Sequence, residues 1–225
     1  MRPYNIATIY LLMSIFLFAA ACQDSTTGGG SDLTESLEPV EEVSAVEGGE
    51  SATVMVNKDS KAFFSVEFSE IGANDIIQNG TIEAWCIDWD TYINSDGGIY
   101  RDIPLYSTYN VEKWMPVNYL LNIQEALQAN DPEITYLEIQ LAIWSLRKNP
   151  EFDLDEVAIG DLPGRFEKDG QPTFNYEKVG EVLDEVEEGY RAFDFSAVGT
   201  KFAVIAKTPP DVQTFFGVVE KQPEF

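Results

Sequence analysis

The feature that most constrains the fold of this chain is the separation of strand-like from helix-like segments along the sequence. Segments rich in β-branched and aromatic residues, which favour strands, lie on both sides of a helical middle, at 52–56, 62–68, 81–89, 201–206 and 212–219. The middle carries apolar residues at helical spacing over 117–129, 131–148 and 176–193. Strands at both ends around a helical middle predict an α+β domain, a β-sandwich or barrel with a helical insertion.

The second of these helices has clear boundary signals. Asp131 is placed to cap its N-terminus, and Pro132 stands at the first helical position, where a missing N–H costs nothing. Asn149-Pro150 ends the segment, because a proline disfavours helical geometry in the residue before it. We therefore expect a helix over about 131–148, with Gln140 near its middle.

The N-terminus has the layout of an export signal. Arg2 precedes an apolar run over 6–21, which is shorter than the roughly 20 residues that a membrane-spanning helix needs. The run ends in small residues directly before Cys22, and this junction resembles a bacterial lipobox, whose cysteine is acylated. The resemblance implies an exported protein, anchored in the cell envelope by a lipid on Cys22 and exposed at the cell surface.

The same reading divides the chain into three parts. Residues 1–21 are the predicted signal peptide. Residues 22–51, which are acidic and glycine-rich with almost no aromatic side chains, form a predicted tether behind the lipid. Residues 52–225 form the predicted folded domain, which is long enough to bury a core of its own.

Acidic residues dominate the charge of the chain. Asp and Glu number 39 against 14 Lys and Arg, which gives a formal net charge of −25. Such a surface repels nucleic acid and anionic headgroups, so we expect no nucleic-acid partner. The chain has no histidine, which excludes the usual Ser-His-Asp and Cys-His catalytic arrangements and nearly all zinc sites. The sequence predicts no metal and no cofactor.

The strand-like segment 81–89 contains a cysteine without an obvious partner. The chain has two cysteines, and Cys22 is assigned to the lipid anchor, so Cys86 is left over. An unpaired cysteine in an exported protein indicates either a reactive thiol or a buried one that behaves as a small hydrophobe.

Gln140 is the second residue whose surroundings are unusual. Its same-face neighbours on the predicted helix are Tyr136, Leu137, Ile143 and Trp144. Burying an amide among such side chains is costly unless the amide is hydrogen-bonded or chemically changed. The spacing also fits a simpler interpretation, in which Gln140 lies on the solvent edge of an amphipathic helix.

Two short segments together resemble the bacterial thioester domain family. They are Trp85-Cys86-Ile87 and the helical segment Ile139-Gln140-Leu141-Ala142-Ile143-Trp144, which match a cysteine after an aromatic or apolar residue and a later Gln-x-Ala-apolar-Trp motif. The resemblance implies an internal thioester that joins the Cys86 sulfur to the Gln140 side-chain carbonyl. It also implies a water-excluding wall, for which the suitable side chains are Trp85, Tyr136, Ile143 and Trp144.

The function implied by this resemblance is covalent attachment. An amine, or a hydroxyl, on a partner protein or other surface ligand would take the acyl group of Gln140 and free the Cys86 thiol. Because this happens once for each molecule, the protein would be an adhesin-like reactant and not an enzyme.

Other interpretations of the sequence remain open. The chain can be a non-covalent binding lipoprotein with a buried free Cys86, recognising its ligand through the aromatic-rich segment 99–119. Asp88 and Asp90 can form a carboxylate pair of a hydrolase, and residues 94–97 hint at a calcium loop that lacks the full ligand pattern.

Overall fold

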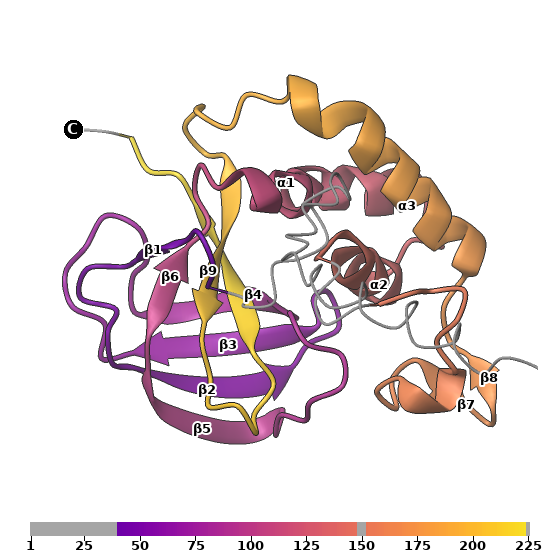
Figure 1. The fold of residues 1–225 in the computed structure, drawn as a ribbon, viewed down its shortest axis with the longest axis horizontal. Coiled ribbons are helices and arrows are strands. Elements are labelled where there is room, and N and C mark those ends of the chain that lie inside the picture. Colours follow the sequence, from indigo (N-terminus) through magenta and orange to yellow (C-terminus); the bar gives the residue numbers. More distant parts are fainter. Residues whose placement is uncertain (1–39, 148–151, 224–225) are drawn as a thin grey trace, which may run out of the picture. The chain divides into compact units, whose positions relative to one another are not determined.

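The computed structural model describes residues 40–147 and 152–223, all of them in one compact unit, Leu33–Phe225 (Figure 1). The predicted signal peptide and Cys22 lie outside the described residues. Within the described part, no helix is long and apolar enough to cross a membrane.

The described strands form one eight-stranded antiparallel sheet, together with a separate small hairpin of β7 and β8. The order across the sheet is β1-β6-β9-β10-β4-β3-β2-β5, so β1 and β5 are its edges and the sheet is not a closed barrel. Its strands are β1 (Ser44–Ala45), β2 (Ala52–Lys58), β3 (Phe64–Ser69), β4 (Gly80–Cys86), β5 (Asp96–Ile103), β6 (Leu105–Ser107), β9 (Lys201–Ala206) and β10 (Phe215–Glu220).

All three described α-helices lie between β6 and β9 in the chain, which confirms the predicted α+β class and the helical insertion. The insertion contains η2 (Glu112–Trp114), α1 (Met115–Asn130), α2 (Tyr136–Arg147), η3 (Ile159–Asp161), β7 (Glu167–Lys168), β8 (Gln171–Pro172), α3 (Tyr176–Gly189) and η4 (Tyr190–Ala192).

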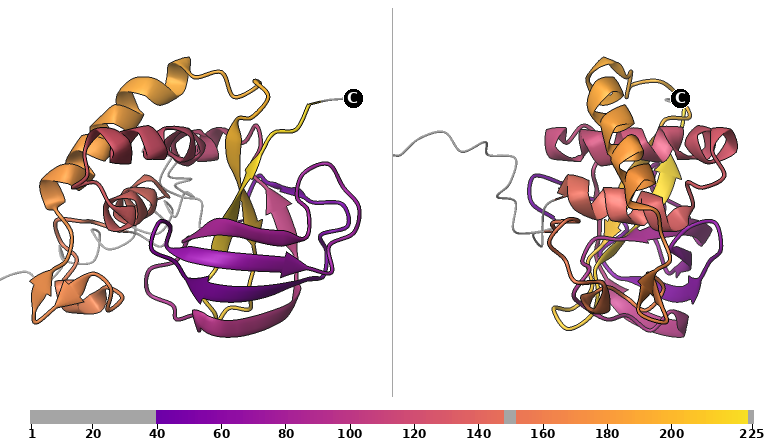
Figure 2. Two further views of the ribbon diagram at one scale, coloured as in Figure 1. Left: turned by 180° about the vertical axis from the view of Figure 1, so that it is seen from behind. Right: turned by 90° about the vertical axis from the view of Figure 1, so that its right-hand side faces the viewer.

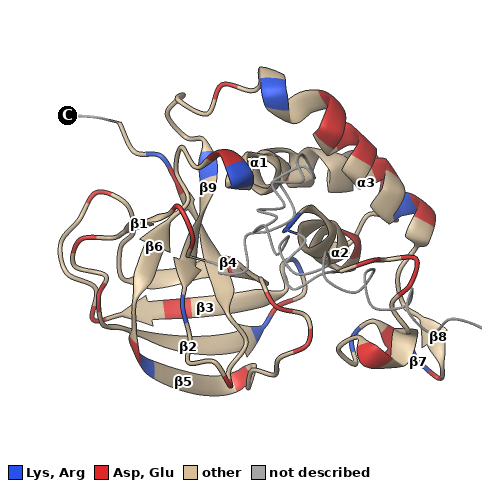
Figure 3. Cartoon of the chain, in the orientation of Figure 1, with Lys and Arg blue, Asp and Glu red and all other residues tan. Residues whose placement is uncertain are grey.

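Helix α2 is the central helix of the insertion. It contacts α1, α3 and strand β4, and its buried side chains lie on all sides of the helix. Helix α3 covers the helical layer from outside (Figures 1 and 2), and its outward side carries a row of acidic residues (Figure 3). A helix that is apolar on most of its circumference, like α2, is stable only in such a buried position.

The start of α2 differs from the prediction. Asp131 is the C-cap of α1, and the helix begins at Tyr136 after Thr135. The Glu138 carboxylate accepts a hydrogen bond of 2.7 Å from the Thr135 backbone N–H, and the Leu137 N–H donates to Thr135 Oγ1 at 3.2 Å. This is a capping box, which satisfies N–H groups at the start of the helix. It places the helix start after Thr135, and Asp131 with Pro132 belongs to the preceding turn.

The folded part begins before the predicted boundary at residue 52. Strand β1 pairs with β6, and the Val46 N–H donates to the Leu105 carbonyl at 2.9 Å. Val46 is buried. The C-terminal end of the predicted tether is therefore part of the domain, because apolar side chains within its acidic sequence find a place in the core.

The strand around Cys86 is shorter than the predicted 81–89, because β4 ends at Cys86 itself. On one side β4 pairs with β10, with Cys86 opposite Phe215. On its other side β4 pairs with β3, whose first residue, Phe64, lies opposite Ala84. Cys86 thus lies two residues beyond the last pair with β3, and its backbone is left without a strand on that side.

Candidate functional site

The Gln140 side chain reaches from α2 to the end of β4 and binds the backbone of Cys86 twice. The Cys86 N–H donates to Gln140 Oε1 at 2.8 Å, and Gln140 Nε2 donates to the Cys86 carbonyl at 3.0 Å. Both residues are completely buried, with relative exposures of 0%. The alternative in which Gln140 lies on the solvent edge of its helix is therefore wrong.

Strand geometry explains why the carboxamide fits there. Backbone N–H and C=O groups of successive strand residues point to opposite edges. The Ile87 N–H donates to the Thr214 carbonyl, just before β10 begins. The backbone N–H and C=O of Cys86 therefore point to the opposite edge of β4, where β3 no longer pairs with it. Two buried backbone groups without a partner would be costly. The Gln140 side-chain amide hydrogen-bonds to both of these Cys86 backbone groups, as the backbone of a neighbouring strand residue would.

The Cys86 side chain leaves the strand out of the plane of these hydrogen bonds, as strand side chains do. Directly opposed residues of paired strands share a face, so the thiol lies on the same side of the sheet as Phe215 and Phe64. Cys86 forms no disulfide and is buried.

The four predicted shielding residues occupy different positions. On α2, Ile143 and Trp144 are buried, and Tyr136 is half-buried at the N-terminus of the helix. Trp85 is buried too, but it precedes Cys86 in β4 and so points to the opposite face, where it lies opposite Phe216. The prediction that Trp85 shields the thiol therefore does not fit the strand geometry.

Aromatic side chains that the motifs did not indicate complete the apolar surroundings. The Phe63 ring packs 6.0 Å from Trp144 and 5.8 Å from Phe166, and Trp144 lies 5.3 Å from Phe166, all measured between ring centroids. Phe63 also faces Tyr136 at 6.4 Å. Phe63 lies within the predicted strand segment 62–68 and directly before β3, but Phe166 comes from a loop in which no periodic pattern marks it.

Burial has the largest effect on the pKa of the Cys86 thiol, and of the charged groups that act on it Arg165 lowers this pKa and Asp88 raises it. The guanidinium carbon of Arg165 lies 4.3 Å from the centre of the Phe63 ring and 5.4 Å from that of Phe64, and its Nη1 donates to the Phe63 carbonyl. Burial raises the pKa of the Cys86 thiol well above its ordinary value, and the positive charge of Arg165 opposes this rise. The site therefore holds a protonated thiol beside a cation that favours the thiolate.

The carboxylates considered for a hydrolase do not act as a pair on a strand. Asp88 lies after the end of β4, and its Oδ2 accepts a hydrogen bond of 2.9 Å from the Thr214 N–H. Burial raises the pKa of Asp88. Asp90 is exposed. The two carboxylates thus have different environments and no common strand face.

Two other carboxamides in the domain bind a backbone in the same two-bond manner. Asn122 accepts from the Lys201 N–H and donates to the Lys201 carbonyl, both at 2.8 Å. Asn79 does the same with Ile71, at 2.9 and 3.2 Å. We call these three arrangements amide clamps. The clamp on Cys86 differs from those on Lys201 and Ile71 in that the clamped residue carries a thiol.

A cavity of about 450 Å³ has Phe63, Phe64 and Arg165 in its lining, but neither Cys86 nor Gln140. Its link to the site is through these three side chains, since the Arg165 guanidinium stacks on both rings and Phe64 shares the thiol's face of the sheet. Asp90 and Asp161 contribute carboxylates to the lining, and Trp89 and Tyr92 contribute aromatic surface. Lys58 and Arg165 also line the cavity, so it combines an apolar wall with two cations and two carboxylates.

Comparison of this chain with protein-family models, with curated proteins and with solved structures gave no match.

Proposed function

We propose that this protein is an exported, lipid-anchored surface protein that forms a thioester between the Cys86 sulfur and the Gln140 side-chain carbonyl. The thioester would attach it once, as in an adhesin, to an amine or hydroxyl of a partner. One observation carries the proposal: two hydrogen bonds hold the Gln140 carboxamide against Cys86 in a fully buried site.

The direction of approach supports thioester formation. The carboxamide lies along the edge of the strand, in the plane of the backbone hydrogen bonds that it makes. The Cys86 side chain projects out of that plane. The sulfur therefore meets the carbonyl carbon from one face of the amide, which is the direction from which a nucleophile adds to a carbonyl.

The bond would form by exchange of ammonia for sulfur. The Cys86 sulfur adds to the Gln140 carbonyl carbon, the bond from that carbon to Nε2 breaks, and the thiol proton leaves with the ammonia. Negative charge develops on Oε1 during the addition. The Cys86 N–H already donates to this oxygen at 2.8 Å, so the clamp supplies a pre-positioned donor for the oxyanion.

Capture of a partner would reverse the roles. The amine nitrogen adds to the same carbon, the carbon–sulfur bond breaks, and the amine proton passes to the departing sulfur. The products are an amide between Gln140 and the partner and a free Cys86 thiol, so the protein is consumed and not regenerated. The cation of Arg165 favours negative charge on the leaving sulfur.

The cavity of about 450 Å³ is the proposed approach path for the amine. The carboxylates of Asp90 and Asp161 offset the cations of Lys58 and Arg165 in its lining, and the net charge of −25 attracts a cationic amine at longer range. The packed rings of Phe63, Trp144 and Phe166 keep bulk water from the bond until the partner arrives.

The test is capture of a small amine. Purified protein is incubated with methylamine, and peptide mass spectrometry locates the adduct. The proposal predicts one methylamine on Gln140 and a newly titratable thiol on Cys86, with neither event in Cys86→Ala or Gln140→Ala. Asn122→Ala, which removes a clamp elsewhere, should capture methylamine as the wild type does. Methylamine adducts that persist in Cys86→Ala would contradict the proposal.

A second candidate is a non-covalent binding lipoprotein in which Gln140 only supports the backbone. The clamps of Asn122 on Lys201 and Asn79 on Ile71 favour it, because they perform that task without any cysteine. The same experiment separates the two candidates, since this one predicts no adduct and a reduced thiol in untreated protein.

A further inference from the structure

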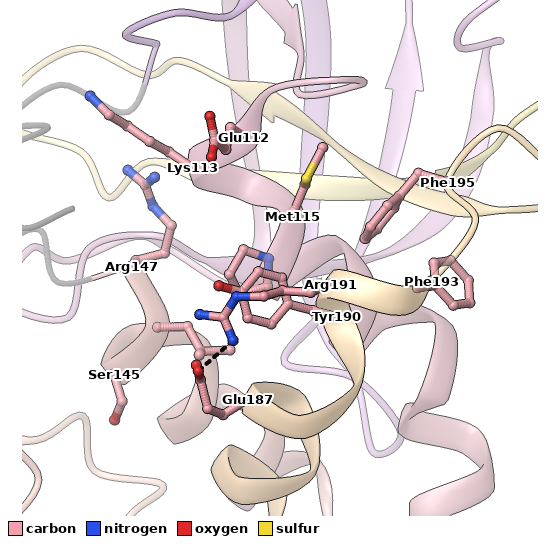
Figure 4. A pocket seen from close by; sticks show the side chains of 12 residues that line it. Glu112, Lys113, Met115, Ser145, Arg147, Glu187, Tyr190, Arg191, Phe193 and Phe195 are labelled. Carbon is pink, nitrogen blue, oxygen red and sulfur yellow. Dashed lines mark hydrogen bonds and ion pairs between the residues drawn. The ribbon is translucent and has the colours of Figure 1, made fainter. Parts of the chain in front are cut away.

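A second cavity lies at the C-terminal end of α2, away from the Cys86–Gln140 pair. Its volume of about 590 Å³ falls within the roughly 300–1,000 Å³ of small-molecule sites. Residues from three places in the chain line it: the η2–α1 junction, the end of α2, and the end of α3 with η4 and the loop that follows. Figure 4 shows Lys113 and Arg147 on one side and the rings of Phe193 and Phe195 on another.

Arg147 is the unusual member of this lining. Its relative exposure is 6%, and its Nε and Nη2 atoms are buried with no hydrogen-bond partner among the described residues. These two nitrogens form one edge of the guanidinium, and their N–H groups point in parallel to receive the two oxygens of a carboxylate. Leaving a buried cation with an empty edge is costly.

The groups around Arg147 do not fill that edge. Its guanidinium stacks 4.2 Å from the centre of the Trp114 ring, which contacts the face of the group and leaves its edge free. Asp88 and Glu41 act on it electrostatically, but Oδ2 of Asp88 already accepts from the Thr214 N–H. Burial lowers the pKa of Arg147 to about 10, so the side chain keeps its charge at neutral pH.

The other two basic side chains of the cavity already have acidic partners. Arg191 Nη1 lies 2.7 Å from Glu187 (Figure 4), and Lys113 Nζ lies 3.0 Å from Glu42. Opposite the basic side, Met115, Phe193 and Phe195 offer apolar surface. Glu112 adds a carboxylate beside Lys113 (Figure 4), so one end of the cavity is charged and the other end is apolar. At the charged end, Arg147 is the cation whose Nε and Nη2 have no hydrogen-bond partner among the described residues.

We propose that this cavity binds a small organic acid, with its carboxylate on Nε and Nη2 of Arg147 and an apolar or aromatic body against Met115, Phe193 and Phe195. Both nitrogens are buried, so binding requires the Arg147 side chain to turn this edge towards the cavity. This site does not depend on the thioester proposal. The net charge of −25 repels anions at long range, but at physiological ionic strength that repulsion decays over about 8 Å, so it does not prevent binding at a buried arginine.

The probe is phenylacetate, with the neutral, nearly isosteric phenylacetamide as its control. Full-length protein is titrated with each, by calorimetry and by NMR of the Met115 methyl group. We expect saturable phenylacetate binding that shifts the Met115 signal, and at least tenfold weaker binding of phenylacetamide. Arg147→Lys keeps the charge but loses the parallel edge, so it should weaken phenylacetate binding at least tenfold. Arg101→Lys, the same change on exposed strand β5, should have no effect.

Three results would overturn the proposal. They are equal affinity for phenylacetate and phenylacetamide, wild-type affinity in Arg147→Lys, and a Met115 signal that does not respond to phenylacetate. Arg147 packs on Trp114, so its substitution can affect folding. If Arg147→Lys loses its native methyl spectrum, the comparison of the two probes on the wild type still decides.

Discussion

The Gln140 carboxamide occupies the place that a neighbouring strand residue would take beside Cys86. It accepts from the Cys86 N–H at 2.8 Å and donates to the Cys86 carbonyl at 3.0 Å, at the point where β3 has ended and β10 pairs on the other side. One side chain therefore supports the backbone and, in the proposed function, also supplies the acyl carbon that the Cys86 thiol attacks. The free energies of unfolding of alanine variants at Cys86 and Gln140 distinguish the backbone-supporting role from the proposed covalent one.

Three alanine variants divide the contribution of this site. Cys86→Ala removes the proposed cross-link, and closing a 54-residue loop is worth about 4 kcal/mol by chain-entropy arguments. It also retains Nε2, which leaves as ammonia when the thioester forms, so this variant has both bonds of the clamp. Asn122→Ala removes a comparable half-buried clamp on Lys201 and should cost about 1 kcal/mol. Gln140→Ala removes the cross-link and leaves both Cys86 backbone groups without the amide, so it should cost the most. Denaturant unfolding measures all three.

The order of these losses carries the prediction. A loss of only about 1 kcal/mol in Cys86→Ala is what a buried thiol without a cross-link would give. That result, with a large loss in Gln140→Ala alone, would contradict the cross-link and leave Gln140 as a structural residue.

The capping box at the start of α2 should control the position of Gln140. Glu138, which is 2% exposed, accepts from Thr135 Oγ1 at 2.5 Å and from the Asn175 N–H at 2.9 Å, in addition to the Thr135 N–H. Glu138→Gln replaces one accepting oxygen with a donor, so we expect a loss of about 1–3 kcal/mol and slower methylamine capture. Thr135→Ser keeps the hydroxyl and should behave as the wild type. Capture at the wild-type rate in a destabilised Glu138→Gln would show that the cap does not position Gln140.

The raised pKa of Asp88 predicts a pH dependence of stability with a definite sign. Burial makes the folded protein bind this proton more tightly than the unfolded chain does, where the pKa is about 3.9. Stability therefore falls as pH rises from about 4 through the raised folded pKa. Asp88→Asn can still accept from the Thr214 N–H but cannot ionise.

Thermal unfolding between about pH 4 and pH 7 measures this effect. Relative to the wild type, Asp88→Asn should become progressively more stable as pH rises across that range. A constant difference between the two proteins over the whole range would contradict the assignment of this dependence to Asp88.

The sequence allowed the helix and the strand of the site to be predicted, but not how they meet. Gln140 and Cys86 each lie within a segment of strong local pattern, so their elements are set by nearby residues. Their contact depends on β3 starting at Phe64, two residues short of covering Cys86, and no local pattern specifies that register.

Other differences between prediction and structure have similar causes. The helix start was misplaced because Asp131-Pro132 and Thr135-x-x-Glu138 are both start signals. Asp131 accepts from the Glu133 N–H and pairs with Lys178, but it does so as the cap of a turn, and the reciprocal capping bonds are made by Thr135 and Glu138. Arg165 and Phe166 come from a loop, where no periodicity indicates which side chains turn inwards. The resemblance to thioester domains is specific only at the two short motifs, which contain neither residue.

The central claim concerns one covalent bond, and the intact mass of the purified, untreated protein tests it most directly. Peptide mapping fixes the mature N-terminus, and Cys86→Ala and Gln140→Ala serve as references. We predict that the wild type is lighter than its formula by the mass of one ammonia, and that both variants match theirs. A wild type at its full formula mass, or the same deficit in all three proteins, would contradict the account.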